Sequence, residues 1–319
     1  MVKYIKKGGE FVAQIDLITG FLGSGKTTFL KLYVKHLLSR GLKIGIIEND
    51  YGAVNVDMML LSELMELGCE VETIAGACDY DCHKRRFKTK LIAMGMQNFD
   101  RVIIEPSGIF DVDEFFDTLR EEPLDRWFKI GNVIAIADAA AVSNLSEESS
   151  YILANQAANA GAIILSKTQL SDETKINAKI DEINSALNSV NCRRKINDIV
   201  IAKNWDDFTE DDFNKILNCG YELNDFKKSH FKGGYSSVYF MNSKITRNKI
   251  KSVSKKLFKN KDCGNIYRIK GFLKENANWL ELNATEKQFE LKPIKNGQDI
   301  IIVIGENLNE KEIKKLWNS

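Results

Sequence analysis

The stretch Gly20-Phe21-Leu22-Gly23-Ser24-Gly25-Lys26-Thr27 decides the fold, because it has the pattern G-x4-G-K-[ST] between a predicted strand and a predicted helix. Residues 14–19 before it are β-rich, and residues 28–34 after it repeat their apolar positions with helical spacing. In this order the glycines let the backbone wrap around phosphate groups, so that N–H groups and a helix N-terminus face the negative charge. The sequence therefore predicts a phosphate-binding loop.

The residues of this loop have predicted roles in holding a nucleotide. Lys26 is expected to reach the β- and γ-phosphates, and the Thr27 hydroxyl is expected to bind Mg²⁺. The remaining contacts with the nucleotide are assigned to Gly20, Gly23, Ser24, Gly25 and Thr28.

Short β-branched runs alternate with helical segments well beyond the loop. Uniformly apolar runs predict strands at 43–48, 101–105, 132–138, 162–165 and 199–201. Helical periodicity separates them at 84–97, 112–120, 149–160, 173–189 and 209–218. Strands without polar alternation are typical of a parallel sheet that is covered on both faces. We therefore predict an α/β fold with a doubly wound, mostly parallel sheet, as in P-loop nucleotide hydrolases.

The pattern of apolar and polar residues changes near residue 228. Residues 235–240 alternate like a half-exposed strand, a basic helix is predicted at 246–258, and further strands are predicted at 266–270 and 299–304. We predict a nucleotide-binding domain over residues 1–225 and a smaller α+β domain over residues 226–319. The polar stretch 218–228 is the candidate linker between them.

The overall composition limits the classes of partner. The chain has 319 residues, with 45 Lys and Arg against 44 Asp and Glu, and a formal net charge of +1. Nothing in this balance favours nucleic acid or an anionic membrane. No apolar run approaches the ~18 residues of a membrane span, and no secretion signal follows the basic N-terminus. We expect a cytoplasmic protein, whose six cysteines are thiols or metal ligands rather than disulfides.

A nucleotide site of this kind needs acidic residues near the loop for Mg²⁺ and for the attacking water. The apolar run 101–105 ends on Glu105, and Gly108 can bring a backbone N–H close to the γ-phosphate. The loop 48–57 contributes Asp50, which is expected either to sense the γ-phosphate through Mg²⁺ or to be part of an ordinary acidic loop. The predicted catalytic residues are Lys26, Asp50 and Glu105, and the predicted Mg²⁺ ligands are Thr27, Glu105 and Asp50.

A second candidate metal site lies in residues 76–83, which read Gly-Ala-Cys-Asp-Tyr-Asp-Cys-His. Cys78, Cys82 and His83 place two thiols and an imidazole within six residues, and such donors suit Zn²⁺ or another transition metal. Three donors do not complete a tetrahedral site, so a fourth must come from water, Cys69, a partner protein or a second protomer. The alternative interpretation is a pair of buried thiols beside a surface histidine.

The order of these motifs resembles the CobW-type family of GTPases, relatives of the hydrogenase- and urease-maturation GTPases that help to load metals into proteins. Residues 20–28 match the family's G-x-L-G-x-G-K-T-T loop, residues 48–57 its N-E-F-G…D segment, and residues 105–108 its E-x-S-G. Four further segments resemble its V-D-A strand end, Q-x3-A-D helix, R-x-K-G strand and closing F-I-G-x-x-L run; these are 136–139, 156–160, 267–271 and 302–308. The resemblance extends over nearly the whole chain.

The sequence departs from the family pattern at the cysteines. Where the family usually has G-C-x-C-C, this chain has fewer thiols at a different spacing, followed by His83. Ligand type and geometry set metal selectivity, so this departure leaves the preferred metal open.

The second departure lies where the family reads guanine with N-K-x-D. Here the chain has Ser166-Lys167-Thr168-Gln169. The neutral amide of Gln169 cannot accept hydrogen bonds from both guanine donors as a carboxylate does, and the loss of one charge-assisted bond reduces discrimination by roughly ten- to a hundred-fold. Lys167 can still lay its alkyl stem along a purine. GTP is therefore the expected nucleotide, with ATP or mixed use as its competitor.

Together these expectations describe a nucleotide-hydrolysing metallochaperone or metal-enzyme maturation factor. Its cofactors would be GTP or ATP with Mg²⁺, its cargo Zn²⁺ or another divalent transition metal, and its partners a client metalloprotein and, in a homodimer, a second copy. One alternative is a nucleotide-dependent regulatory or assembly switch without metal cargo. The other is a small-molecule kinase, which would transfer the phosphate to an acceptor rather than to water.

Overall fold

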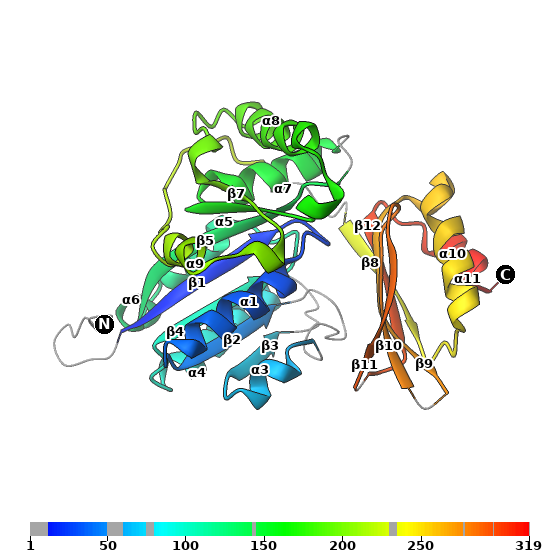
Figure 1. The fold of residues 1–319 in the computed structure, drawn as a ribbon, viewed down its shortest axis with the longest axis horizontal. Coiled ribbons are helices and arrows are strands. Elements are labelled where there is room, and N and C mark those ends of the chain that lie inside the picture. Colours follow the sequence, from blue (N-terminus) through cyan, green and yellow to red (C-terminus); the bar gives the residue numbers. More distant parts are fainter. Residues whose placement is uncertain are drawn as a thin grey trace. The chain divides into compact units, whose positions relative to one another are not determined.

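The computed structural model describes residues 12–49, 60–74, 80–141, 145–229, 235–276, 278–295 and 297–318, without the side chains of Asn49 and of residues 80–83. The chain forms two compact units, Met1–Ser229 and His230–Ser319 (Figure 1). Two of the predicted site residues, Asp50 and Cys78, lie outside the described residues.

The first unit is built on a parallel sheet. Among its described residues, seven strands pair in the order β3-β2-β4-β1-β5-β6-β7, and every pair is parallel. Because β1 lies between β4 and β5, the loop that follows β1 opens at the carboxyl ends of three adjacent strands, where open α/β sheets bind their ligands. The strands are β1 (Ala13–Gly20), β2 (Ile44–Asn49), β3 (Glu70–Ile74), β4 (Arg101–Pro106), β5 (Phe128–Asp138), β6 (Ala162–Ser166) and β7 (Val200–Ala202).

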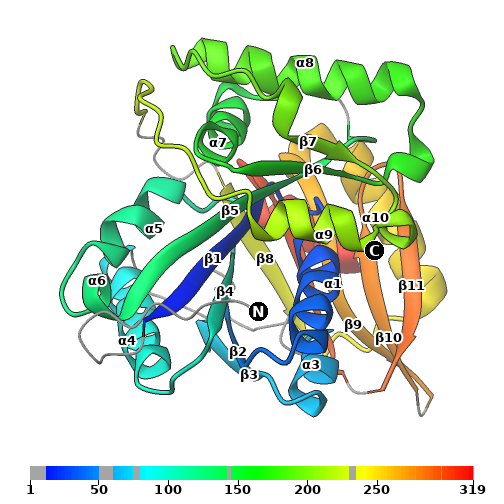
Figure 2. The ribbon, with the colours of Figure 1, turned by 60° about the vertical axis from the view of Figure 1, so that its left-hand side comes forward.

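Helices cover both faces of this sheet (Figure 2). On one face, α1 (Lys26–Ser39), α3 (Ser62–Glu66) and α9 (Glu210–Leu217) share a core with the strands. The other face carries α4 (Tyr80–Gly95), α5 (Val112–Leu119), α6 (Leu124–Trp127), α7 (Glu147–Ala158) and α8 (Glu173–Ser189). Three short turns of 3-10 helix are η1 (Thr168–Leu170), η2 (Asn197–Ile199) and η3 (Trp205–Asp207). Among the described residues, no helix combines the length and the apolar character that a bilayer crossing requires.

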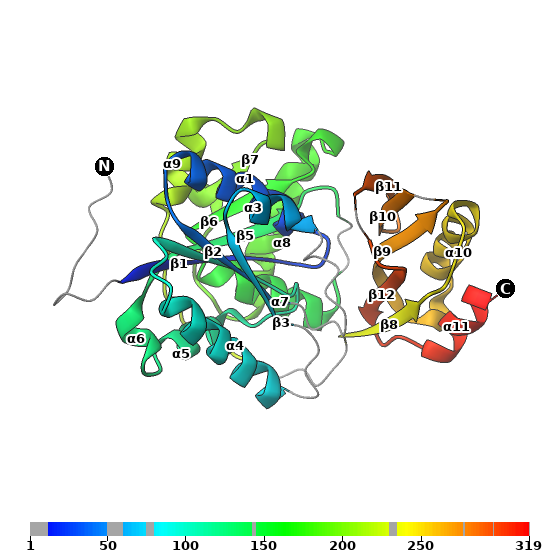
Figure 3. The same ribbon diagram turned by 90° about the horizontal axis from the view of Figure 1, so that it is seen from below.

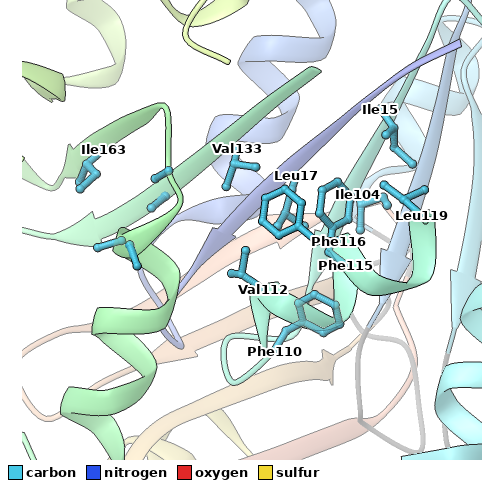
Figure 4. Close-up of a cluster of buried hydrophobic side chains, with 14 of the residues drawn as sticks. Ile15, Leu17, Ile104, Phe110, Val112, Phe115, Phe116, Leu119, Val133 and Ile163 are labelled. Atoms are coloured by element: carbon cyan, nitrogen blue, oxygen red, sulfur yellow. The ribbon is translucent and has the colours of Figure 1, made fainter. Parts of the chain in front are cut away.

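The larger core lies between the sheet and α4–α8. Phe110 and Phe115, both fully buried, belong to the same cluster as Leu17 of β1 and Ile104 of β4 (Figure 4). Burial of a side chain of this size stabilises the fold by about 1.5–3 kcal/mol. The packing anchors the segment that leaves β4, in which Gly108 lies against Leu22 of the loop that follows β1.

The predicted α/β fold is confirmed, and the predicted strands of the first unit are all present and parallel. The sequence did not predict β3, because this short edge strand alternates charged and apolar residues instead of forming an apolar run. Helix α4 was predicted to begin at residue 84 but begins at Tyr80, so Cys82 and His83 lie in its first turn.

The stretch 218–228, predicted as a linker, is hydrogen-bonded to the first unit instead. The Glu222 N–H donates to the Asn159 carbonyl, and the Lys227 N–H donates to the Val190 carbonyl. These bonds tie the stretch to the ends of α7 and α8, because its backbone groups need partners wherever water is excluded. The compact units divide after Ser229.

The second unit is an antiparallel sheet, and its described helices α10 and α11 lie on one face (Figure 3). Its described strands pair in the order β11-β10-β9-β12-β8. Phe240 stacks on Trp317 with 3.8 Å between the ring centroids, which fixes the C-terminal helix to the sheet. The elements are β8 (Tyr235–Met241), α10 (Arg247–Lys259), η4 (Lys261–Cys263), β9 (Asn265–Glu275), β10 (Asn278–Ala284), β11 (Phe289–Ile294), β12 (Ile300–Glu306) and α11 (Glu310–Asn318). The sequence did not predict α11 or the β10–β11 hairpin, in which polar and apolar residues alternate.

Candidate functional site

The predicted phosphate-binding loop has the conformation that its glycines allow. Gly20 ends β1 with φ +144°, and a Cβ there would lie 2.2 Å from the Ile136 carbonyl oxygen, so only glycine fits. Gly25 is the N-cap of α1 in a left-handed conformation, and no side chain caps the helix. The first N–H groups of α1 are therefore directed at the loop without a side-chain acceptor, as an anion-binding helix terminus requires.

Lys26 lies folded over this loop. Its ammonium Nζ donates a hydrogen bond to the Gly20 carbonyl at 3.0 Å, and the residue is only 8 % exposed. A nearly buried cation at a helix N-terminus creates a strongly positive local field. The loop is thus arranged to attract an anion.

Thr27, in the first turn of α1, meets Glu105 of β4, the strand that pairs with β1. The Thr27 hydroxyl donates a 2.7 Å hydrogen bond to Oε1 of Glu105, which is buried at the end of β4. Glu48 of β2 is also buried and is the register partner of Glu105, so their side chains leave the sheet on the same face. These oxygen donors suit a hard cation such as Mg²⁺. The sequence had not assigned a role to Glu48.

Gly108 packs directly against the phosphate-binding loop. A Cβ at this position would lie 2.5 Å from the Leu22 backbone nitrogen. From α7, the Gln156 amide donates to the Gly108 carbonyl at 3.0 Å, and Asn155 accepts a hydrogen bond from the Val112 N–H at 2.9 Å. Residues of α7 therefore hold the segment after β4 against the loop, a role that the sequence did not reveal although residues 156–160 carry a family motif.

The end of β6 reaches the same loop through Ser166. Its hydroxyl donates to the Ser24 carbonyl at 2.6 Å and so connects β6 to the loop. Lys167 has a left-handed backbone conformation and forms a 2.5 Å ion pair with Asp138 at the end of β5. The ion pair involves only its ammonium group, so the expected contact of its alkyl stem with a base stays a prediction. Gln169 is exposed in η1, and Thr28 is exposed at the start of α1.

Trp205 is a further neighbour of the loop that the sequence did not indicate. Its ring packs on Phe29 of α1 at 5.9 Å between centroids, and its Cζ2 lies 3.3 Å from where a Cβ of Gly25 would be. The indole therefore borders the turn at which α1 begins.

Most of the predicted transition-metal site lies outside the residues that the structure describes. Cys82 and His83 lie in the first turn of α4, but their side chains, like all of Cys78, are outside the described part. In the described ranges, no cluster of three or more His, Cys, Asp or Glu residues is placed to hold a metal. Burial raises the pKa of the Cys69 thiol to about 11, and burial together with Asp16 raises that of Cys219 to about 12. Both thiols are therefore protonated at neutral pH without a metal, and a bound ion would have to displace the proton.

Two family profiles match the chain. Residues 14–196 match "CobW/HypB/UreG, nucleotide-binding domain", and residues 236–319 match "Cobalamin synthesis protein cobW C-terminal domain".

Individual proteins that are similar to this chain have names that are consistent with the two family profiles. "Zinc chaperone YjiA" of Escherichia coli strain K12 is 30% identical over 181 residues, which is 54% of each chain. "Zinc-regulated GTPase metalloprotein activator 1" of Dictyostelium discoideum is 25% identical over 72% of this chain and 53% of its own. The chain thus spans about half the length of these relatives. A crystal structure of Zn(II)-bound YjiA GTPase from E. coli has 21% identity, covers 96% of this chain and 98% of its own, and gives a TM-score of 0.40.

The first profile covers more than half of the chain and includes the loop, the Glu105 strand and Gly108. The chain therefore belongs to the CobW/HypB/UreG family of proteins with a nucleotide-binding domain.

Proposed function

We propose that this protein hydrolyses a nucleoside triphosphate, with GTP as the leading nucleotide, and couples the cycle to binding and release of a divalent transition metal. The observation that carries the proposal is the 2.7 Å contact between Thr27 and Glu105, directly beside the folded Lys26. It supports a site with a cation for the phosphates and oxygen donors for Mg²⁺ at the N-terminus of one helix.

The residues of the loop have separate roles in this proposal. Lys26 and the backbone N–H groups of the loop hold the phosphates, while Thr27 and Glu105, with Asp50, hold Mg²⁺ directly or through water. When bound, Mg²⁺ would neutralise charge on the β- and γ-phosphates. Gly108, which Gln156 keeps against the loop, would supply a backbone N–H to the γ-phosphate.

The metal cargo is assigned to Cys78, Cys82 and His83. Support comes from the donor types and from the names of relatives, which are called zinc chaperones. The segment 48–57 would change with the state of the nucleotide and alter the affinity of the metal loop, because coupling requires different affinities in two conformations. A client metalloprotein would then receive the ion.

Hydrolysis of GTP and of ATP by the full chain tests the first half of the proposal. Rates are measured in Mg²⁺ with and without Zn²⁺, Co²⁺ and Ni²⁺, for the wild type and for Lys26→Ala. We expect Lys26→Ala to abolish nucleotide uptake. If calorimetry on nucleotide-free wild type detects no Mg²⁺-supported uptake of either nucleotide, the proposal is wrong.

Metal binding tests the second half. We expect Cys78→Ser with Cys82→Ser to lose stoichiometric Zn²⁺ binding while it keeps the basal hydrolysis rate, and Cys219→Ser, a thiol outside the loop, to bind like the wild type. Unchanged Zn²⁺, Co²⁺ and Ni²⁺ binding in the double variant would leave a nucleotide-dependent switch without metal cargo. Transfer of the phosphate to an added acceptor rather than to water would instead indicate a kinase.

A further inference from the structure

Helix α10 and the residues that flank it carry an array of exposed cations. The segment 244–261 contains no Asp or Glu, and its basic residues are all exposed. Within the part of the chain that the structure describes, none of them has an ion-pair partner. These residues are Lys244, Arg247, Lys249, Lys251, Lys255, Lys256, Lys259 and Lys261.

This array is part of a charge separation that the overall balance hides. Residues 230–319 contain 18 Lys and Arg against nine Asp and Glu, for a formal charge of +9. Residues 1–229 contain 27 against 35, for a formal charge of −8. The near-neutral net charge of the full chain is therefore no guide to the partners of the second unit, because the electrostatic field of that unit is strongly positive.

The elements packed against α10 do not neutralise it. In α11, Glu310 pairs with Lys314 at 2.5 Å and Glu312 pairs with Lys315 at 3.2 Å, so both carboxylates are already compensated. Strand β9 also packs against α10, and its one acidic residue is Glu275, the last residue of the strand. Asp262 follows α10 as the nearest acid in the sequence and is exposed in η4.

Four of the cations form a ladder along the helix. Arg247, Lys251, Lys255 and Lys259 are spaced by four residues, so consecutive members are neighbours on the helix surface. Like charges at this spacing destabilise a helix, and α10 has no acid in its first turn to offset the cost. Ile250 and Leu257 hold the opposite face on the sheet. The ladder therefore costs folding stability and faces away from the core.

We propose that this ladder docks an acidic helical segment of a partner protein. A partner helix with carboxylates every four residues has the same rise of about 6 Å between charges as the ladder, which extends over about 18 Å. Each carboxylate can then meet one cation in register. Such contacts remove the repulsion within α10 as well as adding attraction.

The chemistry of the face favours a protein over the other polyanions. Its ladder contains three lysines to one arginine, whereas phosphate recognition favours the bidentate arginine fork. The other exposed residues of α10 are Asn248 and Ser252, and its one aromatic residue, Phe258, is partly buried against the core of the unit. The face therefore has no fully exposed aromatic ring for stacking on bases and no fully exposed apolar side chain for entry into a bilayer. The proposal does not depend on nucleotide hydrolysis or metal binding.

Peptide binding to the full chain tests the proposal. The probe is a fluorescent helix-forming peptide with Glu at every fourth position, and its control has the same composition with the Glu residues distributed around the helix. Fluorescence anisotropy is measured at roughly 50 and 300 mM salt. We expect the registered peptide to bind at least about fivefold more tightly, and the variant Lys251→Gln, Lys255→Gln, Lys259→Gln to weaken it about tenfold.

A matched variant distinguishes docking on the ladder from a general effect of net charge. A melting curve distinguishes it from misfolding of the ladder variant. Lys129→Gln, Lys195→Gln, Lys295→Gln removes the same charge from exposed sites elsewhere and should change the affinity less than about twofold. The ladder variant should melt at the same or a higher temperature, because it loses like-charge pairs.

Equal binding of both peptides, or equal weakening by both triple variants, would overturn the proposal. So would tighter, ladder-dependent binding of a random-sequence DNA duplex or of phosphatidylserine-containing vesicles at the higher salt, because the partner would then not be a protein.

Discussion

Substitution Gly108→Ala probes how the segment after β4 positions the phosphate-binding loop. Gly108 is not in a left-handed conformation, so alanine carries no backbone penalty of its own there. Its new methyl group would instead lie 2.5 Å from the nitrogen and 2.8 Å from the Cα of Leu22. Both atoms belong to the backbone of the loop and cannot move out of the way by a rotamer change.

The size of the effect follows from this overlap. Ordinary contact begins at 3.4 Å, so the two segments must separate by roughly 0.9 Å. Overpacking of this kind costs about 1–3 kcal/mol of stability. The same displacement moves the loop N–H groups away from the phosphates, and the loss of one charge-assisted hydrogen bond weakens nucleotide binding by about ten- to a hundred-fold.

Calorimetry with GTP and Mg²⁺, together with urea unfolding, measures both quantities. The control is Gly41→Ala, since Gly41 has φ +75° and no neighbour within 4 Å. The control should lose about 1–2 kcal/mol of stability through backbone strain alone and keep its affinity. If Gly108→Ala binds GTP within about twofold of the wild type while the fold is retained, the contact with Leu22 does not set the loop geometry and the reasoning is wrong.

Three further outcomes are expected. Gln169→Asp should raise the preference for GTP over ATP about ten- to a hundred-fold in competition binding, because a carboxylate accepts from both guanine donors; an unchanged ratio would remove residue 169 from base recognition. Arg101→Met should cost about 3–5 kcal/mol in urea unfolding, because it leaves the buried Asp16 carboxylate without the cation at 2.5 Å, and a loss below about 1 kcal/mol would contradict this. Burial alone would raise the pKa of Asp212, but hydrogen bonds from Lys203 and Thr209 lower it from 3.8 to about 2. The ionised group therefore stabilises the fold above pH 3.8 and loses this contribution as the pH falls through about 2, so Asp212→Asn should flatten that part of the acid unfolding curve.

The parts of the site that the sequence predicted are contiguous motifs. The loop 20–27 and the strand that ends on Glu105 are each specified within a few residues, and both elements are present as predicted. Placing Thr27 beside Glu105 needed only the inference that parallel strands end at one edge of the sheet. Their functional roles remain predictions.

The parts that the sequence missed depend on contacts between distant segments. Gln156 meets Gly108 across 48 residues, and Ser166 meets Ser24 across 142. A glutamine in a helix and a serine at a strand end are common, so neither residue type signals such a contact. Trp205 was missed for the same reason, since its place beside Gly25 follows from how η3 packs on α1.

The sequence by itself determined that this chain has a parallel α/β unit with a glycine-rich loop of the phosphate-binding pattern and a basic helix in a second unit, because glycine pattern, apolar periodicity and charge are local properties of the chain. Only the tertiary structure decided which residues surround that loop, that Lys167 pairs with Asp138, and that the cations of α10 have no ion-pair partner among the described residues. Such pairings depend on which side chains the packed elements bring within a few ångströms of one another, and no local pattern encodes that distance.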